Sequence, residues 1–537
     1  MDQLHQLSWP SAIAILLACA ACYAIFTLHN ATRRPANFPP GPPTVFGLGN
    51  LIHMPITAPF LKFHEWKTTY GDIIGLKVAN QNYVILQSAD HVHELLARKG
   101  SIYSDRMQPY IGMHIMNPES ALFWNYDDRT KKATRAWRHA LGPEGLKRTQ
   151  PHVDAFAALM TGRLLEQSDR FHDIAKRWAL DSTLMTVTGM QLDELEPGYL
   201  DAYFSMQKRW LYYLQPSTAP PVDLLPVLKY LPPALVTWKR AAAELGSEFS
   251  IFMGRYLESA KAKHAEMPMG PGPGEQRFEP FMAWLVRQSL DKSGLFFKSS
   301  EIKGIGNTTI DGSVDTSLYT TTQMVHALAS FPEVQEAAQR EVDSLCPNAP
   351  PMPDQLPSFR YLRAIFYELL RWRPPVPTAP RVLREDDTYG SFHLPKGTVC
   401  LINSYSIQND PDWYDKPLNF SPQRYVDNPW GVKPSRRAEA EARGRKRSFT
   451  FGVGRRQCPG ADFAEQQVIL SVAKLVWAFE VTALAPVDWD WETGFNTAAL
   501  VVGPKPTPVR FEVRGEGKAK AVRDDATRGK HLLASIR

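Results

Sequence analysis

The chain has 537 residues, of which 44% are hydrophobic and 22% are charged, a composition that excludes a mostly disordered protein. Five cysteines exclude a disulfide-dense secreted scaffold. A formal net charge of +6 is too small to indicate a nucleic-acid-binding surface. At about 150 residues per domain, length alone predicts three or four domains.

An apolar segment near the N-terminus predicts a membrane anchor over residues 1–32. The run from Ser11 to Leu28 contains no charged residue, and as a helix it would be about 27 Å long, close to the hydrocarbon thickness of a bilayer. Arg33 and Arg34 follow directly, so the positive-inside bias predicts that the rest of the chain is cytosolic. A cleaved secretory signal is the alternative, which is disfavoured because no basic region precedes the apolar run.

The segment after the anchor, residues 33–50, is a proline-rich hinge, because consecutive prolines favour a stiff extended chain. Hydrophobic periodicity and turn residues predict the elements that follow. In chain order they are a β-hairpin at 72–88, mostly helices from 89 to 345 with a proline-broken connection at 218–233, a long helix from Ser300 to Phe331, a second helix from Ser358 to Trp372, and a strand at 397–402. The tail at 515–537 is polar and basic and is predicted to be disordered. The expected fold class is mainly α with small β-sheets (α+β).

The most informative segment is the loop at 448–460, SFTFGVGRRQCPG. Its glycines permit tight turns, and Arg455 and Arg456 put positive charge close to Cys458, which favours a thiolate. A helix begins just after the cysteine, and its N-terminus also stabilises an anion. Such a thiolate could be a metal ligand or a nucleophile, and a buried structural cysteine is the plain alternative.

This loop resembles the haem-binding loop of the cytochrome P450 family. The match is Phe451-x-x-Gly454-x-Arg456-x-Cys458-x-Gly460, and it opens a helix near the C-terminus as in that family. The resemblance implies that Cys458 is the axial ligand of the haem iron. It also implies that Arg456 binds a haem propionate and that Phe451 packs near the sulfur.

A second motif, Glu-x-x-Arg, lies on the predicted 358–372 helix. Glu368 and Arg371 are three residues apart and can pair on one helix face. In the resembling family a further arginine in Phe-x-Pro-x-Arg completes a structural triad, and Arg424 stands at that place here. Bidentate arginine–carboxylate geometry explains why lysine would not serve.

The predicted helix from 300 to 331 contains IDGSVDTS at 310–317, which resembles the oxygen-activation segment of the family. The resemblance implies that Thr316 hydrogen-bonds the bound dioxygen or its water and that Asp315 relays protons. We expect a local widening of the helix here, which would free backbone groups for water. Ser313 replaces a glycine of the family pattern.

One family feature is missing, the Trp-x-x-x-Arg pair that contacts a propionate. Thr130 and Thr134 occupy those positions, which leaves Lys131 or Arg135 as substitute candidates. Six basic residues between 436 and 447 precede the cysteine loop. They form either a solvated loop or a docking surface for an acidic electron donor.

The resemblance implies one haem-thiolate catalytic domain at 51–514, of microsomal type and similar to fungal members that oxidise secondary metabolites. The expected cofactor is haem b, and electrons would come from NADPH through a separate NADPH–cytochrome reductase, with cytochrome b5 as a further donor. The expected reaction is monooxygenation, by hydroxylation or another oxidation, of a lipophilic small molecule. The enzyme would sit in the endoplasmic reticulum membrane as a single-pass protein with a cytosolic catalytic domain, in contact with lipid and not with nucleic acid.

Pocket residues are expected from the segments at 106–116, 204–235 and 376–381 and from the helix near Asp311, whose mixed apolar character indicates a lipophilic substrate. Two alternatives remain open at this point. One is a haem-thiolate isomerase or dehydratase that needs no reductase, and the other is a non-catalytic, membrane-tethered haem protein. The presence of Asp315 and Thr316 argues against both.

Overall fold

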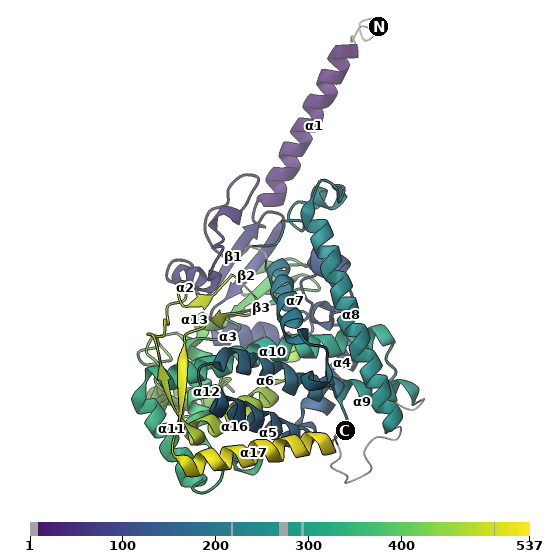
Figure 1. The fold of residues 1–537 in the computed structure, drawn as a ribbon. Coiled ribbons are helices and arrows are strands. Elements are labelled where there is room, and N and C mark those ends of the chain that lie inside the picture. Colours follow the sequence, from purple (N-terminus) through teal and green to yellow (C-terminus); the bar gives the residue numbers. More distant parts are fainter. Residues whose placement is uncertain are drawn as a thin grey trace, which may run out of the picture.

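The computed structural model describes residues 9–536 except for 216–217, 268–277, 292–294, 427 and 499. Helix α1 (Trp9–Thr32) projects away from the rest of the protein (Figure 1). Its span from Ile13 to Thr32 has a mean hydropathy of 1.8, and no residue of the most apolar 18-residue window is buried against the protein. It is therefore long and apolar enough to cross a membrane, and it extends beyond the predicted apolar run at both ends.

A four-stranded sheet lies next to α1 and has the strand order β1-β2-β6-β3. Strands β1 (Ile73–Val78) and β2 (Gln81–Leu86) form the predicted antiparallel hairpin. Strand β6 (Val399–Asn403) pairs in parallel with β2, and β3 (Thr378–Val382) pairs antiparallel with β6. The sheet thus joins segments that are about three hundred residues apart in the sequence, and it holds β3 beside the cysteine loop.

Among the described residues, three two-stranded ladders account for the remaining strands. They pair β4 (Asp387–Tyr389) with β5 (Phe392–Leu394), β7 (Phe479–Ala483) with β10 (Val509–Val513), and β8 (Phe495–Asn496) with β9 (Gly503–Pro504).

Helices form most of the protein, as predicted. Those that precede the long central helix are α2 (Pro59–Tyr70), α3 (Ala89–Val92), α4 (Asp128–Leu141), α5 (Pro143–Glu166), α6 (Phe171–Thr188), α7 (Tyr199–Leu214), α8 (Thr237–Glu266) and α9 (Phe281–Leu290). Those that follow are α11 (Pro332–Leu345), α12 (Arg360–Trp372), α13 (Ser404–Gln408), α14 (Gln423–Val426), α15 (Arg437–Ala442), α16 (Ala461–Ala478) and α17 (Glu516–Ser535).

Helix α10 (Ser299–Ser330) runs through the middle of the helical body (Figure 1). It packs against α6, α8, α12 and α16, so most of its side chains are buried. Pro332 ends the predicted helix as expected, but it also begins α11, since proline is favoured at the first helical position. One hydrophobic cluster extends from Ile111 to Leu533, so a single core surrounds α10.

The prediction of a disordered C-terminal tail is wrong, because residues 516–535 form α17, which lies along α5 (Figure 1). Ala519, Val522 and Leu533 are buried at helical spacing. The composition of the tail did not reveal this buried helix face, because its other buried residues, Asp525 and Gly529, are not hydrophobic.

Candidate active site

The cysteine loop is shaped by two glycines in left-handed backbone conformations. Gly452 has a φ of +67° and Gly454 a φ of +68°, which favour glycine. A side chain at Gly454 would also collide with the main-chain oxygen of Leu96. The amide of Cys458 donates a hydrogen bond of 2.8 Å to the carbonyl oxygen of Phe451, and α16 begins three residues later. The loop therefore carries Cys458 to the start of a buried helix.

The Cys458 side chain is accessible to solvent, yet the surrounding protein raises the pKa of its thiol above the ordinary value. A hydrogen bond from the amide of Gly460 and the charge of Arg106 lower the pKa of this thiol and partly offset that effect. The expectation that Arg455 and Arg456 favour the thiolate is therefore wrong in its residues. Both guanidinium groups lie over the Tyr126 ring, 5.3 and 5.5 Å from its centre, and the cation that acts on the sulfur comes from the 101–106 segment.

Three arginines converge beside the loop, and we call Arg106, Arg381 and Arg456 the arginine trio. Burial lowers the pKa of each, to about 9 for Arg381 and about 10 for Arg456, and well below the ordinary value for Arg106. The positive charges also act on one another, since Arg456 lowers the pKa of both other members. Such mutual repulsion is unfavourable unless an anion is bound nearby.

The hydrogen-bond partners of the trio are main-chain carbonyl groups. Arg106 and Arg381 both donate to Pro380, at 3.1 and 2.8 Å, and Arg456 donates to Ser104 at 2.8 Å. Within the described ranges, no carboxylate lies within ion-pair distance of any of the three guanidinium groups. The Nε atom of Arg106 is buried and has no partner. The trio can therefore hold a group with more than one negative charge.

The proposed substitutes for the missing propionate partner lie elsewhere. Lys131 is exposed and pairs with Asp128 at 3.0 Å, and Arg135 is exposed on α4. Arg106 and Arg381 are better placed to bind a propionate. From the sequence they were expected only as end residues of two segments predicted to line the substrate pocket. Their burial depends on β3 and on the 101–106 segment coming together, which no local pattern signals.

Glu368, Arg371 and Arg424 come together at the C-terminal part of α12. The Arg371 guanidinium binds both carboxylate oxygens of Glu368, at 2.8 and 2.9 Å, and Arg424 adds a bond of 3.1 Å. The side chains of Glu368 and Arg371 have no exposed area. Arg371 also donates to the carbonyl oxygen of Pro417 at 2.8 Å, so the pair ties α12 to the segment before α14.

The segment at 310–317, which resembles an oxygen-activation segment, lies on α10 without the expected widening. The helix is α-helical from end to end, and the Thr316 hydroxyl donates to the carbonyl oxygen of Gly312 at 2.7 Å. The Ser313 hydroxyl lies 3.1 Å from that of Thr183 on α6. Asp315 is 3% exposed, and burial raises the pKa of its carboxyl to about 6. A carboxyl with this pKa can both hold and release a proton near neutral pH.

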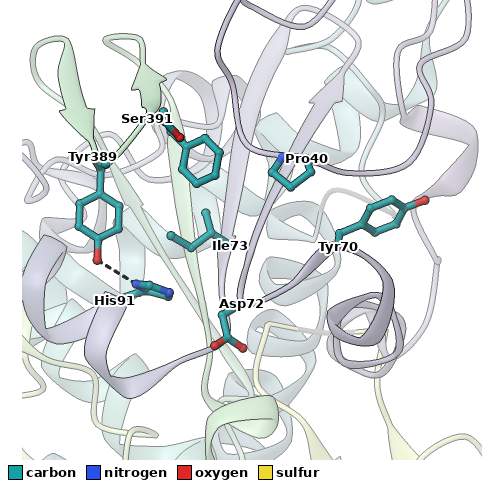
Figure 2. Close-up of a pocket in the computed structure, with 9 residues that line it drawn as sticks. Pro40, Tyr70, Asp72, Ile73, His91, Tyr389 and Ser391 are labelled. Carbon is teal, nitrogen blue, oxygen red and sulfur yellow. Dashed lines mark hydrogen bonds between the residues drawn. The ribbon is translucent and has the colours of Figure 1, made fainter.

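A separate surface hollow of about 530 Å³ lies between the hinge, β1 and the β4–β5 ladder. Figure 2 shows Tyr389 and His91 on one side of it and Tyr70 on the other, with a hydrogen bond of 2.8 Å between the Tyr389 hydroxyl and His91. None of its lining residues is among the predicted site residues, so this hollow is not the candidate active site.

Comparisons with known proteins agree with the motifs. A model of the Cytochrome P450 family matches residues 39–511. A cytochrome P450 monooxygenase of Arthrobotrys oligospora is 29% identical over 520 residues, which cover 94% of each chain. Another, of Aspergillus ruber, is 27% identical over 96% of this chain and 94% of its own. A solved zebrafish cytochrome P450 with progesterone has a similar fold, with a TM-score of 0.69, 21% identity, and coverage of 85% of this chain and 99% of its own. The chain therefore belongs to the cytochrome P450 family and is a cytochrome P450 monooxygenase.

Proposed function

We propose that this enzyme binds haem b between the Cys458 loop and the arginine trio and oxidises a lipophilic small molecule. The observation that carries the proposal is the trio, in which Arg381 is buried and Arg106 and Arg456 are half-buried. Its three cations have main-chain partners and no paired carboxylate among the residues that the structure describes. The two propionates of haem would supply the missing negative charge as charge-assisted hydrogen bonds. The unpartnered Nε of Arg106 is a donor available for such a group. The residues present therefore fit this cofactor.

In this proposal Cys458 would be the protein ligand of the haem iron, and Arg456 would share the propionates with Arg106 and Arg381. Phe451 would pack near the sulfur. Gly454 lets the loop approach the main chain of Leu96 closely, and the amide of Gly460 is directed at the sulfur. When bound, the haem supplies dioxygen activation, which a thiolate ligand favours by donating electron density. Metal binding displaces the thiol proton, so the raised pKa of free Cys458 opposes but does not prevent ligation.

On α10, Asp315 would hold a proton and Thr316 would position its acceptor. The Thr316 hydroxyl hydrogen is directed to Gly312, so its oxygen remains able to accept a hydrogen bond. Burial keeps Asp315 partly protonated near neutral pH. Together these residues support an oxidation that consumes two protons, and they would have no role in an isomerase.

Electrons would come from NADPH through a separate reductase, with cytochrome b5 as a further donor. The basic segment at 436–447 supports docking of the reductase, but only some of its cations are available for a partner. Arg443 and Arg436 pair with Glu439, and Arg445 is 8% exposed, with its guanidinium 4.1 Å from the centre of the Trp413 ring. The exposed side chains of Arg437, Lys446 and Arg447 remain. We assign the docking surface to these three cations, which would steer an acidic partner.

We place the protein in the endoplasmic reticulum membrane, with α1 as a single span and the catalytic body in the cytosol. The part of the α7–α8 connection that leads into α8 lies at the end of the protein from which α1 projects (Figure 1). It exposes Leu225, Val227, Tyr230 and Leu235, by 52%, 67%, 85% and 74%. Exposed apolar side chains of this kind gather at membrane surfaces. The two relatives from fungi support a role in the oxidation of fungal secondary metabolites.

The test uses the full-length protein in microsomes with and without NADPH–cytochrome reductase. We expect a thiolate-type carbon monoxide difference spectrum and product formation that requires both NADPH and reductase. Cys458→Ala should lose this spectrum, whereas Cys400→Ala, which changes a buried cysteine on β6, should keep it. Product without reductase would identify an isomerase or dehydratase instead. An unchanged spectrum in Cys458→Ala would remove Cys458 from the axial position.

Comparison of metabolites between a deletion strain and its parent would identify the substrate. Compounds that accumulate in the deletion strain and are oxidised by the microsomes are the expected result. A strain with an unchanged metabolite profile under conditions in which the protein is expressed would contradict the assignment to secondary metabolism.

A further inference from the structure

Two carboxyl groups lie one helical turn apart on α10, at Asp311 and Asp315. Residues four apart share a helix face, so these groups are neighbours. One oxygen of Asp311 accepts a hydrogen bond of 2.7 Å from the Asn307 amide. The other oxygen of Asp311 and one oxygen of Asp315 are buried and have no hydrogen-bond partner.

Helix α7 presents two polar side chains to this pair, again one turn apart. Tyr203 is 1% exposed and Gln207 is 3% exposed, and the Tyr203 hydroxyl and the Gln207 carbonyl oxygen also lack partners. The charges of Asp311 and Asp315 raise the pKa of Tyr203 beyond the effect of its burial. A hydrogen bond from Gln207 lowers the pKa of Asp315. The four side chains therefore form one group, in which Asp311 is half-buried and the other three are buried. We call it the α7–α10 acid cluster.

The unpartnered polar atoms of the cluster include more hydrogen-bond acceptors than donors. Asp311, Asp315 and Gln207 each contribute an oxygen that can only accept while both carboxyls are ionised, and the Tyr203 hydroxyl is a single donor. Buried acceptors without donors are strongly unfavourable. A proton on one carboxyl turns an acceptor into a donor and removes the shortage. Repulsion between the two carboxyls acts in the same direction, since Asp315 raises the pKa of Asp311.

We propose that Asp311 and Asp315 share one proton, that the pair is the proton store of the oxygen-activation segment, and that Tyr203 and Gln207 hold it in position. The inference rests on the proposed function, because it extends the relay role of Asp315. When the pair releases its proton both carboxyls are ionised, and a proton from solvent restores the store, with no other bond changed. Tyr203 and Gln207 are positioning residues, and they make proton delivery depend on the placement of α7.

The experiment compares Asp311→Asn, Asp315→Asn, Tyr203→Phe and a matched control, Tyr199→Phe. Tyr199 lies on the same helix, one turn before Tyr203, and bonds the Tyr256 hydroxyl at 3.1 Å. The first readout is the infrared C=O stretching band of a protonated carboxyl in the resting holoenzyme, followed as a function of pH. The second is product and hydrogen peroxide formed per NADPH consumed. A carbon monoxide difference spectrum checks that each variant is folded.

We expect the wild-type band to titrate near neutral pH. Its midpoint should move to lower pH in Asp311→Asn, because removing one carboxyl removes the repulsion on the other. Product per NADPH should fall roughly tenfold in Asp311→Asn, less than the effect of removing a general acid entirely. Tyr203→Phe should shift the band and raise peroxide formation several-fold, while Tyr199→Phe should behave as wild type.

An unchanged band and unchanged coupling in both Asp311→Asn and Tyr203→Phe would overturn the shared proton. If Asp315→Asn alone then lost coupling, the relay of the proposed function would stand without the pair. If the wild type formed no reductase-dependent product, the proposed function would fail, and the infrared titration would still decide whether the proton is shared.

Discussion

The guanidinium of Arg381 donates a hydrogen bond of 3.0 Å to the main-chain carbonyl oxygen of Arg456, which brings a buried cation close to a half-buried one. Burial lowers the pKa of both side chains, and the charge of Arg456 lowers that of Arg381 further. A folded protein retains such an arrangement when an anion compensates it. The presence or absence of a carboxylate partner distinguishes two kinds of arginine. Arg371 has a buried carboxylate partner and stabilises the fold, whereas Arg381 and Arg456 are available to bind a ligand.

Replacing Arg381 with alanine should weaken haem binding while leaving the apoprotein as stable as before or more so. The reason is that the substitution removes a propionate donor from the holoprotein but relieves repulsion in the apoprotein. The measurements are haem transfer to apomyoglobin and thermal melting of the apoprotein. Arg384→Ala is the control, because Arg384 is 45% exposed and pairs with Asp105. A destabilised apoprotein with unchanged haem transfer would mean that Arg381 is purely structural.

The pH dependence should follow the raised pKa of Asp315. Coupling of NADPH use to product should decline as pH rises through about 6, because the protonated donor disappears. Since the folded pKa lies above the ordinary value of 3.8, the associated stability is present below pH 4 and is lost as pH rises through 6, by about 3 kcal/mol. Urea midpoints at pH 4 and pH 7.5 should therefore differ less in Asp315→Asn than in wild type. An equal difference in both proteins would contradict the assignment.

Lys474 should be critical for the attachment of α17. It is 1% exposed and pairs with Asp154 at 2.9 Å and Asp525 at 2.7 Å. Lys474→Met leaves these buried carboxylates short of a cation, for which we expect a loss of about 3–5 kcal/mol, together with faster hydrogen exchange in α17. Lys518→Met is the control on α17, and its surface pair with Asp343 should contribute about 1 kcal/mol or less. Equal effects of the two substitutions would refute the role of Lys474.

Deleting residues 1–32 should weaken but not abolish binding to phospholipid vesicles. The exposed apolar side chains at Leu225, Val227, Tyr230 and Leu235 remain and can enter the interface. Vesicle flotation measures the bound fraction. Changing these four residues to serine in the truncated protein should release it into solution, and retention of the truncated variant on vesicles after that change would show that the connection is not a membrane contact.

Motifs whose chemistry is local could be predicted from the sequence. The glycines at 452 and 454 and the Glu368–Arg371 spacing specify backbone turns and a helix face within a few residues, so their geometry follows from neighbouring positions. The bounds of α10 were predicted in the same way, from a local pattern. The expected widening of this helix did not occur, because the helix is unbroken at Thr316 and the Thr316 hydroxyl donates a hydrogen bond within it.

Features that depend on distant partners were missed for a physical reason. Arg106 and Arg381 are separated by 275 positions, and only the pairing of β3 with β6 and the bridge from Asp105 to Val382 bring them together. The charges of Asp525 and Arg528 made the tail look solvated, because their buried partners lie on α5 and α16. Whether a charged residue is buried depends on segments that are distant in the sequence. The hydrophobic periodicity of a single strand or helix therefore does not reveal it.

The position of α17 has a consequence for how the protein is made. Asp154 and Lys474 are both in place once α16 has been synthesised, but Asp525 and Arg528 complete their network from α17. Helix α17 follows α16 and the β7–β10 ladder in the chain, so it can dock on α5 only as the last of these elements to be synthesised. A stop codon between residues 515 and 525 would therefore leave Asp154 and Lys474 in the chain without their ion-pair partners on α17.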